Sequence, residues 1–196
     1  MEAVSYATRT RQMVWTALLS ALAALLMYLD MAVPLFPSFL KMDLSDVPAL
    51  IGAFIWGPGA GILIEAIKNG INTFTTTSAG IGQVANFIMG SALVLPAGFV
   101  YRRWHTKKGA VAGLILGTLS MAVIAAVANT WFLLPFYSRF IPLDKIVAMS
   151  HAVIPAITDL RSLVLYGVVP FNIFKGIIVS LATFALYKRI SVLLSR

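Results

Sequence analysis

The residues of this chain that could do chemistry are charged and amide side chains inside otherwise apolar stretches. Lys41, Asp43 and Asp46 interrupt the hydrophobicity between two stretches of membrane-crossing length. Carrying one charge into hydrocarbon costs at least about 2.5 to 3.5 kcal/mol, so charges at this place need a function. A loop precedes these charges, and Pro34 and Pro37 restrict its backbone. We interpret this loop, including Lys41, as a gate over a site.

A second polar group lies on the helix expected at 58–75. Glu65, Lys68, Asn69 and Asn72 follow one another at steps of three or four residues, which places them on one helix face. A polar face on an apolar helix is expected to point away from lipid. These side chains could pair among themselves to hold helices together, or they could contact a ligand, and the spacing leaves both interpretations open.

Isolated polar residues interrupt two later apolar stretches. Asn129 lies near the end of the stretch 109–134, while Asn172 and Lys175 lie one helical turn apart in the stretch 162–187. An amide offers both a hydrogen-bond donor and an acceptor. These side chains could pair among themselves to hold the bundle, but the isolation of Asn129 and Asn172 in apolar sequence favours contact with a ligand.

Composition identifies the chain as an integral membrane protein. Of its 196 residues 60% are hydrophobic and the mean hydropathy is +0.91, whereas soluble domains are about 45 to 50% apolar. The chain has no cysteine, which excludes disulfides, thiolate metal sites and cysteine nucleophiles. Its two histidines have no second ligand at metal spacing, so no metal site is predicted. No GxxxxGK[ST] motif is present, so energy from ATP would have to come from a partner.

The net charge of +8 reflects membrane topology rather than binding to nucleic acid. Nine of the fifteen Lys and Arg residues lie in three clusters, at 9–11, 102–108 and 188–196, each at the end of an apolar stretch. If all three clusters face the cytoplasm, an even number of crossings separates each neighbouring pair. The apolar stretch 47–67 must then be two helices, divided at Gly57-Pro58-Gly59.

The predicted fold class is therefore all-α: a single membrane domain over 1–196, with six transmembrane helices and both termini cytoplasmic. The second helix is short, about 15 Å at 1.5 Å per residue, and must be buried among its neighbours. A short surface helix is also expected within 144–157. The six helices are predicted at approximately 13–33, 46–56, 58–75, 81–101, 109–134 and 162–187.

Small residues at four-residue spacing favour close contact between helices. Gly109, Gly113 and Gly117 form such a face on the fifth helix. The first helix carries two similar pairs, Ala17 with Ala21 and Ser20 with Ala24. Spacing alone slightly favours packing within the chain over docking of a partner for the first helix. This stretch is long for a signal peptide, and no cleavage site of small residues follows it.

The run FPSFLKMDLSDVPALIG at 36–52, followed by Gly57-Pro58, Lys68-Asn69 and Asn172-x-x-Lys175, resembles the RibU-type riboflavin-binding S components of energy-coupling factor (ECF) transporters. The resemblance covers nearly the whole chain. It implies a protein of the bacterial cytoplasmic membrane that captures riboflavin outside, with no cofactor of its own. It also implies inward delivery with a transmembrane T component and two ATPase subunits, and docking on the T component through the small face of the first helix.

The same resemblance implies ligand contacts at Asp43, Asn129, Asn172 and Lys175. The pyrimidine edge of riboflavin alternates acceptors and a donor, which suits asparagine amides. Lys175 would donate to a carbonyl or a ribityl hydroxyl, and Asp43 would be its counter-ion or an acceptor from the hydroxyls; both roles remain open. Candidates for an apolar slot and for one further polar contact are Phe39, Leu40, Met42 and Phe171, and Asn69.

Two other functions remain as alternatives. The chain could be an S component for another vitamin. It could also be a small membrane enzyme that uses Asp43, Asp46 and Glu65 to hold a metal ion against a lipid substrate. Sensitivity to a chelator separates the enzyme from a vitamin-binding protein. We expect a binding subunit and no enzyme.

Overall fold

The structure, a computed structural model, describes residues 2–75 and 80–195; Arg196 of the third basic cluster lies outside these ranges. The longer helices are α1 (Glu2–Met27), α2 (Asp46–Trp56), α3 (Pro58–Thr73), α4 (Ile81–Arg103), α5 (Lys107–Ala128) and α9 (Val169–Ser195). The shorter elements are strands β1 (Met31–Ala32) and β2 (Lys41–Met42), helices α6 (Leu134–Tyr137), α7 (Leu143–His151) and α8 (Leu160–Ser162), and the π-helical segments η1 (Asn129–Leu133) and η2 (Leu163–Val168).

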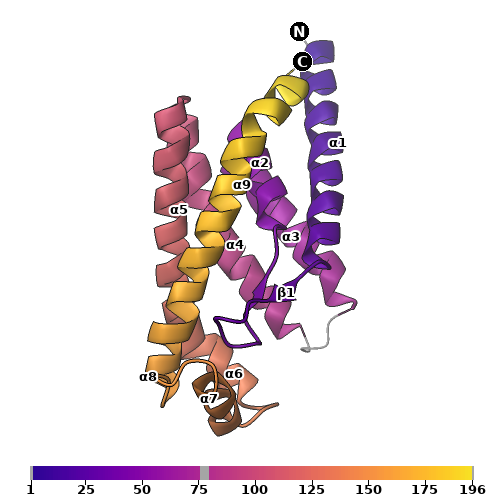
Figure 1. The fold of residues 1–196 in the computed structure, drawn as a ribbon. Coiled ribbons are helices and arrows are strands. Elements are labelled where there is room, and N and C mark those ends of the chain that lie inside the picture. The colour runs from indigo at the N-terminus through magenta and orange to yellow at the C-terminus, as the bar shows by residue number, and fades with distance from the viewer. Residues whose placement is uncertain (1, 76–79, 196) are drawn as a thin grey trace.

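Long helices run roughly along one direction and form a bundle (Figure 1). Within the described residues, four continuous helical stretches are long and apolar enough to cross a membrane: 9–27, 81–103, 107–137 and 160–187. The start of α1 and the end of α9 lie at one end of the bundle, and α6, α7 and α8 lie at the other (Figure 1). The all-α class is confirmed, with one addition, the two-residue ladder between β1 and β2.

Helix α2 lies in the interior of the bundle. It ends at Gly57, whose φ of +95° is readily available only to glycine, and Pro58 begins α3 at once with a φ suited to a first helical position. Every residue from 46 to 54 is buried, and α2 packs against α1, α3, α4 and α9. A helix of 11 residues thus stays covered by protein along its length.

Close contact between α4 and α5 depends on glycine. A Cβ added at Gly113 would lie 2.8 Å from the carbonyl oxygen of Ala97, and one added at Gly117 would lie 2.4 Å from that of Leu93. Because these are backbone atoms, they cannot move aside for a side chain. The expected small-residue contact face of the fifth helix is confirmed at these two positions.

Several helix limits differ from the sequence-based prediction: α1 begins at Glu2, eleven residues before its expected start, and α9 continues to Ser195, eight residues beyond its expected end. The first helix, expected to reach residue 33, ends at Met27. Met31 pairs with Met42 and Ala32 with Lys41, so the chain leaves the helix early to form the ladder. Helix α5 continues through η1 and α6 to Tyr137, three residues beyond its expected end. The short surface helix is α7, Leu143–His151.

Candidate functional site: a pocket between the lid and the bundle

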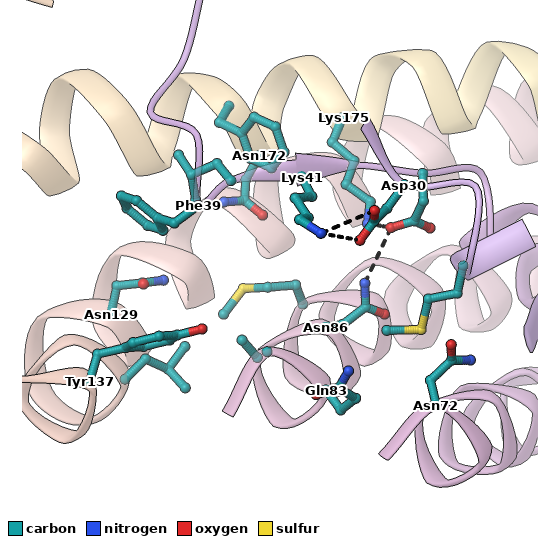
Figure 2. Close-up of a pocket in the computed structure, with 18 of the residues that line it drawn as sticks. Asp30, Phe39, Lys41, Asn72, Gln83, Asn86, Asn129, Tyr137, Asn172 and Lys175 are labelled. Carbon is teal, nitrogen blue, oxygen red and sulfur yellow. Dashed lines mark hydrogen bonds and ion pairs between the residues drawn. The ribbon is translucent and has the colours of Figure 1, made fainter. Parts of the chain in front are cut away.

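A pocket of about 490 Å³ opens between the bundle and the segment 30–43. We call this segment the lid. The volume falls within the range of about 300 to 1,000 Å³ usual for sites that bind small molecules. The pocket is lined by residues of α1, the lid, α3, α4, α5, η1, α6 and α9 and by Thr75. Figure 2 shows labelled side chains converging on it from several of these elements.

Lys175 and Asp43 form a buried ion pair in the wall of the pocket. Nζ of Lys175 lies 2.9 Å from Oδ2 of Asp43 and 3.4 Å from Oδ2 of Asp46. The other oxygen of Asp43, Oδ1, accepts a hydrogen bond of 2.8 Å from the backbone N–H of Ser45. Two roles had been left open for Asp43, and in the structure it is the counter-ion of Lys175.

Behind this pair lies a second one, centred on Lys68. Its Nζ donates to Oδ1 of Asp46 and, at 2.8 Å, to Oγ of Ser45, and it lies 3.0 Å from Oε2 of Glu65. All of these side chains are almost completely buried. For Glu65 and Lys68 the structure therefore shows the internal pairing that spacing had left open. Because Asp46 contacts both lysines, the two pairs form one continuous cluster.

Two asparagines face each other across one end of the pocket. Asn129, the first residue of η1, and Asn172, on α9, point toward each other from opposite sides (Figure 2). Each amide donates to a backbone carbonyl four residues earlier, that of Ala125 at 2.9 Å or Val168 at 2.8 Å. Both residues line the pocket. Each keeps its carbonyl oxygen and one N–H for a ligand.

The pocket differs in character along its length. At the end near Asn129, Phe39 of the lid and Tyr137 of α6 flank the space (Figure 2), and Phe171, Leu133 and Leu134 complete this wall. Toward the other end the labelled side chains are polar: Asp30, Lys41, Asn72, Gln83 and Asn86. Such an arrangement suits a ligand with one flat apolar part and one polar part.

The lid is held in three ways. The β1–β2 ladder joins its two arms, and Nζ of Lys41 lies 3.0 Å from Oδ2 of Asp30. Between the arms, the ring of Phe36 packs against those of Phe171 and Phe174, with centroids 5.4 and 5.7 Å apart. Of the residues expected in the gate, Lys41 lines the pocket, Pro37 is buried and Pro34 is exposed.

The structure brings seven of the nine expected ligand contacts to the pocket: Phe39, Leu40, Asp43, Asn129, Phe171, Asn172 and Lys175. Met42 and Asn69 are corrections. Met42 turns away from the pocket into the apolar core, as alternation along β2 requires when Lys41 faces the pocket. Asn69 is buried within the bundle, where its amide donates to the carbonyl of Glu65 at 2.8 Å.

The sequence-based prediction did not include six polar pocket residues: Tyr28, Asp30, Thr75, Gln83, Asn86 and Tyr137; for Asn72 it had left both interpretations open. Gln83 and Asn86 could have been found, because they stand one turn apart at the start of the fourth apolar stretch. Asn86 reaches toward Oδ2 of Asp43 at 3.5 Å. Asp30 and Tyr137 reach the pocket through tertiary structure, which gives no local signal.

The four small residues of α1 that could dock a partner lie on two different faces of the helix. Ala17 and Ala21 are exposed. Ser20 and Ala24 are buried, at 1% and 4% exposure, and Ser20 donates to the carbonyl of Thr16 within its own helix. A buried residue is not available to a partner in this conformation. Ser20 and Ala24 therefore pack within the chain, and only Ala17 and Ala21 are open to a partner helix.

Helices long and apolar enough to cross a membrane surround a pocket with two amides and an internally paired lysine, which fits a membrane protein that binds a small molecule. The model of the family "ECF transporter, substrate-specific component" matches residues 11–187. The chain belongs to this family. It is therefore a multi-pass transport component of the bacterial cytoplasmic membrane and not an enzyme.

Similar proteins agree with this assignment. The chain is 38% identical to the riboflavin transporter FmnP of Bacillus subtilis over 177 residues, covering 88% of this chain and 87% of that protein. It is 31% identical to the riboflavin transporter RibU of Staphylococcus aureus, covering 96% and 94%. A solved structure, titled "Structure and mechanism of the S component of a bacterial ECF transporter", is similar with a TM-score of 0.76 and 30% identity, covering 96% of this chain and 99% of that one.

Proposed function

We propose that this chain is the riboflavin-binding subunit of an ECF importer. The observation that carries the proposal is the pair of facing amides, Asn129 and Asn172, at the aromatic end of a pocket of suitable size. Relatives named riboflavin transporters match nearly the whole chain, which supports the same ligand here.

The isoalloxazine ring would lie between the two asparagines, whose amides can donate to its carbonyl oxygens and accept from its N–H. Phe39, Tyr137 and Phe171 would cover its faces and its dimethylbenzene edge. The ribityl chain would extend toward the polar end, within reach of Lys175. Because the charge of Lys175 is already matched by Asp43, the site does not demand an anionic ligand.

The proposed topology has six crossings in one membrane domain with both termini cytoplasmic. Both chain ends and the connection between α4 and α5, which carries the basic run 102–108, lie at the same end of the bundle (Figure 1). This arrangement follows the positive-inside rule, and the pocket then opens to the outside. The pair α2 and α3 would supply the two crossings that hydropathy alone does not resolve.

Delivery inward would require a transmembrane T component and two ATPase subunits. The exposed small residues of α1, Ala17 and Ala21, offer a surface where a partner helix can approach closely within the membrane. The lid would open for entry of riboflavin and close behind it.

A fluorescence-quench titration with riboflavin on the detergent-purified protein tests the ligand. Asn172→Ala removes one facing amide, and losing one such hydrogen bond, worth roughly 1 to 3 kcal/mol, should raise Kd about 5- to 150-fold. Asn69→Ala is the matched control, because Asn69 is equally buried but lies outside the pocket. Its Kd should stay close to that of the unmodified protein.

If the unmodified protein does not quench riboflavin fluorescence, the proposal is overturned, and other vitamins would be tested as ligands. Equal affinity of Asn172→Ala and the unmodified protein would show that the Asn172 amide does not contact riboflavin. Repeating the titration with a chelator tests the metal-dependent alternative.

A further inference from the structure

The buried cluster contains one more acidic group than basic groups. Its carboxyls are Asp43, Asp46 and Glu65 and its ammonium groups are Lys68 and Lys175, and each of these side chains is at most 5% exposed. If all five groups were charged, the cluster would carry one uncompensated negative charge. A buried charge without a partner is strongly unfavourable, so the remaining charge must be balanced by something else.

Contacts within the cluster identify the group concerned. Asp46 contacts both lysines, at Nζ of Lys68 and, at 3.4 Å, Nζ of Lys175. Asp43 contacts Lys175 at 2.9 Å and also accepts the backbone N–H of Ser45. Glu65 contacts one lysine, through Oε2. Its Oε1 is buried and has no hydrogen-bond partner in the described part of the chain; Oδ2 of Asp46 has none there either, but it lies 3.4 Å from Nζ of Lys175.

The surroundings of Glu65 lack a donor rather than an acceptor. Oδ1 of Asn69, one turn along α3, is also buried without a partner among residues 2–75 and 80–195. The amide nitrogen of Asn69 lies 3.5 Å from Oε2 of Glu65, so the two side chains are adjacent. A carboxylate and an amide oxygen can only accept, so a hydrogen on the carboxyl group adds a donor to two adjacent side chains that each have an unpartnered oxygen.

The site also has little room. A Cβ on Gly90 of α4 would lie 2.3 Å from Oε2 of Glu65, so the carboxyl group lies directly against a helix backbone. Among the described residues, no group of three or more His, Cys, Asp or Glu is arranged to hold a metal ion. The charged groups that face Glu65 are Lys68 from α3, Asp46 from α2 and, further away, Lys175 from α9. A proton adds the missing positive charge without adding volume.

We propose that Glu65 carries a bound proton in the folded protein at neutral pH. The cluster then contains two carboxylates, two ammonium groups and one neutral carboxylic acid, and its net charge is zero. The hydroxyl hydrogen supplies the donor that the two oxygens lack. Glu65 is thus a proton-binding site, and its proton allows the pocket-lining lysine and aspartate to remain fully paired. This inference stands independently of the identity of the transported ligand.

Matched substitutions test the proposal on the full chain in detergent. Glu65→Gln replaces the neutral acid by a neutral amide of the same shape, and its Tm should stay within about 4 °C of the unmodified protein. Asp46→Asn makes the same chemical change at a carboxylate that is charged and paired with two lysines. Its Tm should fall by more than that of Glu65→Gln, because Lys68 and Lys175 both lose a carboxylate that they contact.

Infrared spectroscopy supplies a measurement that does not depend on stability. A protonated carboxyl group has a C=O stretching band separate from that of carboxylate, and the band shifts in D₂O. We expect such a band at neutral pH in the unmodified protein, and its loss in Glu65→Gln.

The absence of the band from the unmodified protein would overturn the proposal. So would a fall in Tm for Glu65→Gln as large as that for Asp46→Asn. Replacing sodium by choline in the buffer should change neither Tm nor the band; a Tm that depends on sodium would place a metal cation, and not a proton, in the cluster.

Discussion

Lys175 is proposed both to form the buried ion pair with Asp43 and to contact riboflavin, and replacing it by methionine tests both roles. Its ammonium group lies 2.9 Å from Asp43 and 3.4 Å from Asp46, and its side chain is 5% exposed. Methionine has a similar unbranched stem, so Lys175→Met removes the charge and leaves most of the packing in place. Both the stability of the empty protein and its affinity for riboflavin should fall.

The size of the stability change follows from the burial of the pair. Removing one partner of a buried ion pair costs roughly 3 to 5 kcal/mol, because the other charge is left uncompensated. For a protein of this size each kcal/mol corresponds to about 2 to 4 °C in Tm, so we expect a fall of roughly 6 to 20 °C. In the double variant Asp43→Asn/Lys175→Met the uncompensated carboxylate is also gone, while Asp46 remains paired with Lys68. At least half of the lost stability should return.

The assay is thermal unfolding followed by the intrinsic fluorescence of the four tryptophans, without ligand, combined with riboflavin titration. Riboflavin affinity should stay low in both variants, because both lack the ammonium donor. A Tm of Lys175→Met equal to that of the unmodified protein would show that this ion pair does not stabilise the fold. A double variant no more stable than the single one would show that the loss is not due to the uncompensated charge of Asp43.

Two further predictions concern the surface of α1 and the lid. Ala21→Trp fills the small exposed face of α1 and should prevent assembly with the T component while riboflavin affinity changes less than about twofold, as expected for a substitution remote from the pocket. Val123→Trp, on the exposed side of α5, is the control and should assemble normally in co-purification; assembly of both variants would remove α1 as the docking surface. In the lid, Ser38 lines a cavity of about 70 Å³ together with Met149 of α7. The chain has no cysteine, so a bifunctional thiol reagent with a reducible spacer can join Ser38→Cys to Met149→Cys without competition, and the crosslink should stop riboflavin exchange until a reductant is added. Unchanged exchange in the crosslinked variant would show that the lid does not gate the pocket.

Much of the site was predictable because polar groups in apolar stretches need partners. Asp43, Asn129, Asn172 and Lys175 stood out in sequence for this reason, and all four line the pocket. The division between α2 and α3 also followed from sequence, through the parity of the basic clusters and the turn at Gly57.

What could not be predicted depends on tertiary contacts. The early end of α1 depends on β1 pairing with β2, and on Asp30 pairing with Lys41 eleven residues later. Asn69 and Asn72 share a helix face by period, yet Asn72 reaches the pocket and Asn69 is turned toward Glu65. Helical period places residues on a side of a helix, but it does not say which neighbour lies there.

The π-helical segment η1 has a consequence for how this pocket can change during evolution. Met121, Asn129, Leu133 and Tyr137 all line the pocket at multiples of four residues. In an uninterrupted α-helix, 16 residues would rotate the last position about 160° from the first, onto the far side. The π-helical turn of η1, closed by i→i+5 hydrogen bonds, has more residues per turn and so reduces this rotation. Inserting or deleting one residue within 129–133 would therefore turn Tyr137 into or out of the cavity, so that length variation can remodel its aromatic wall without any substitution.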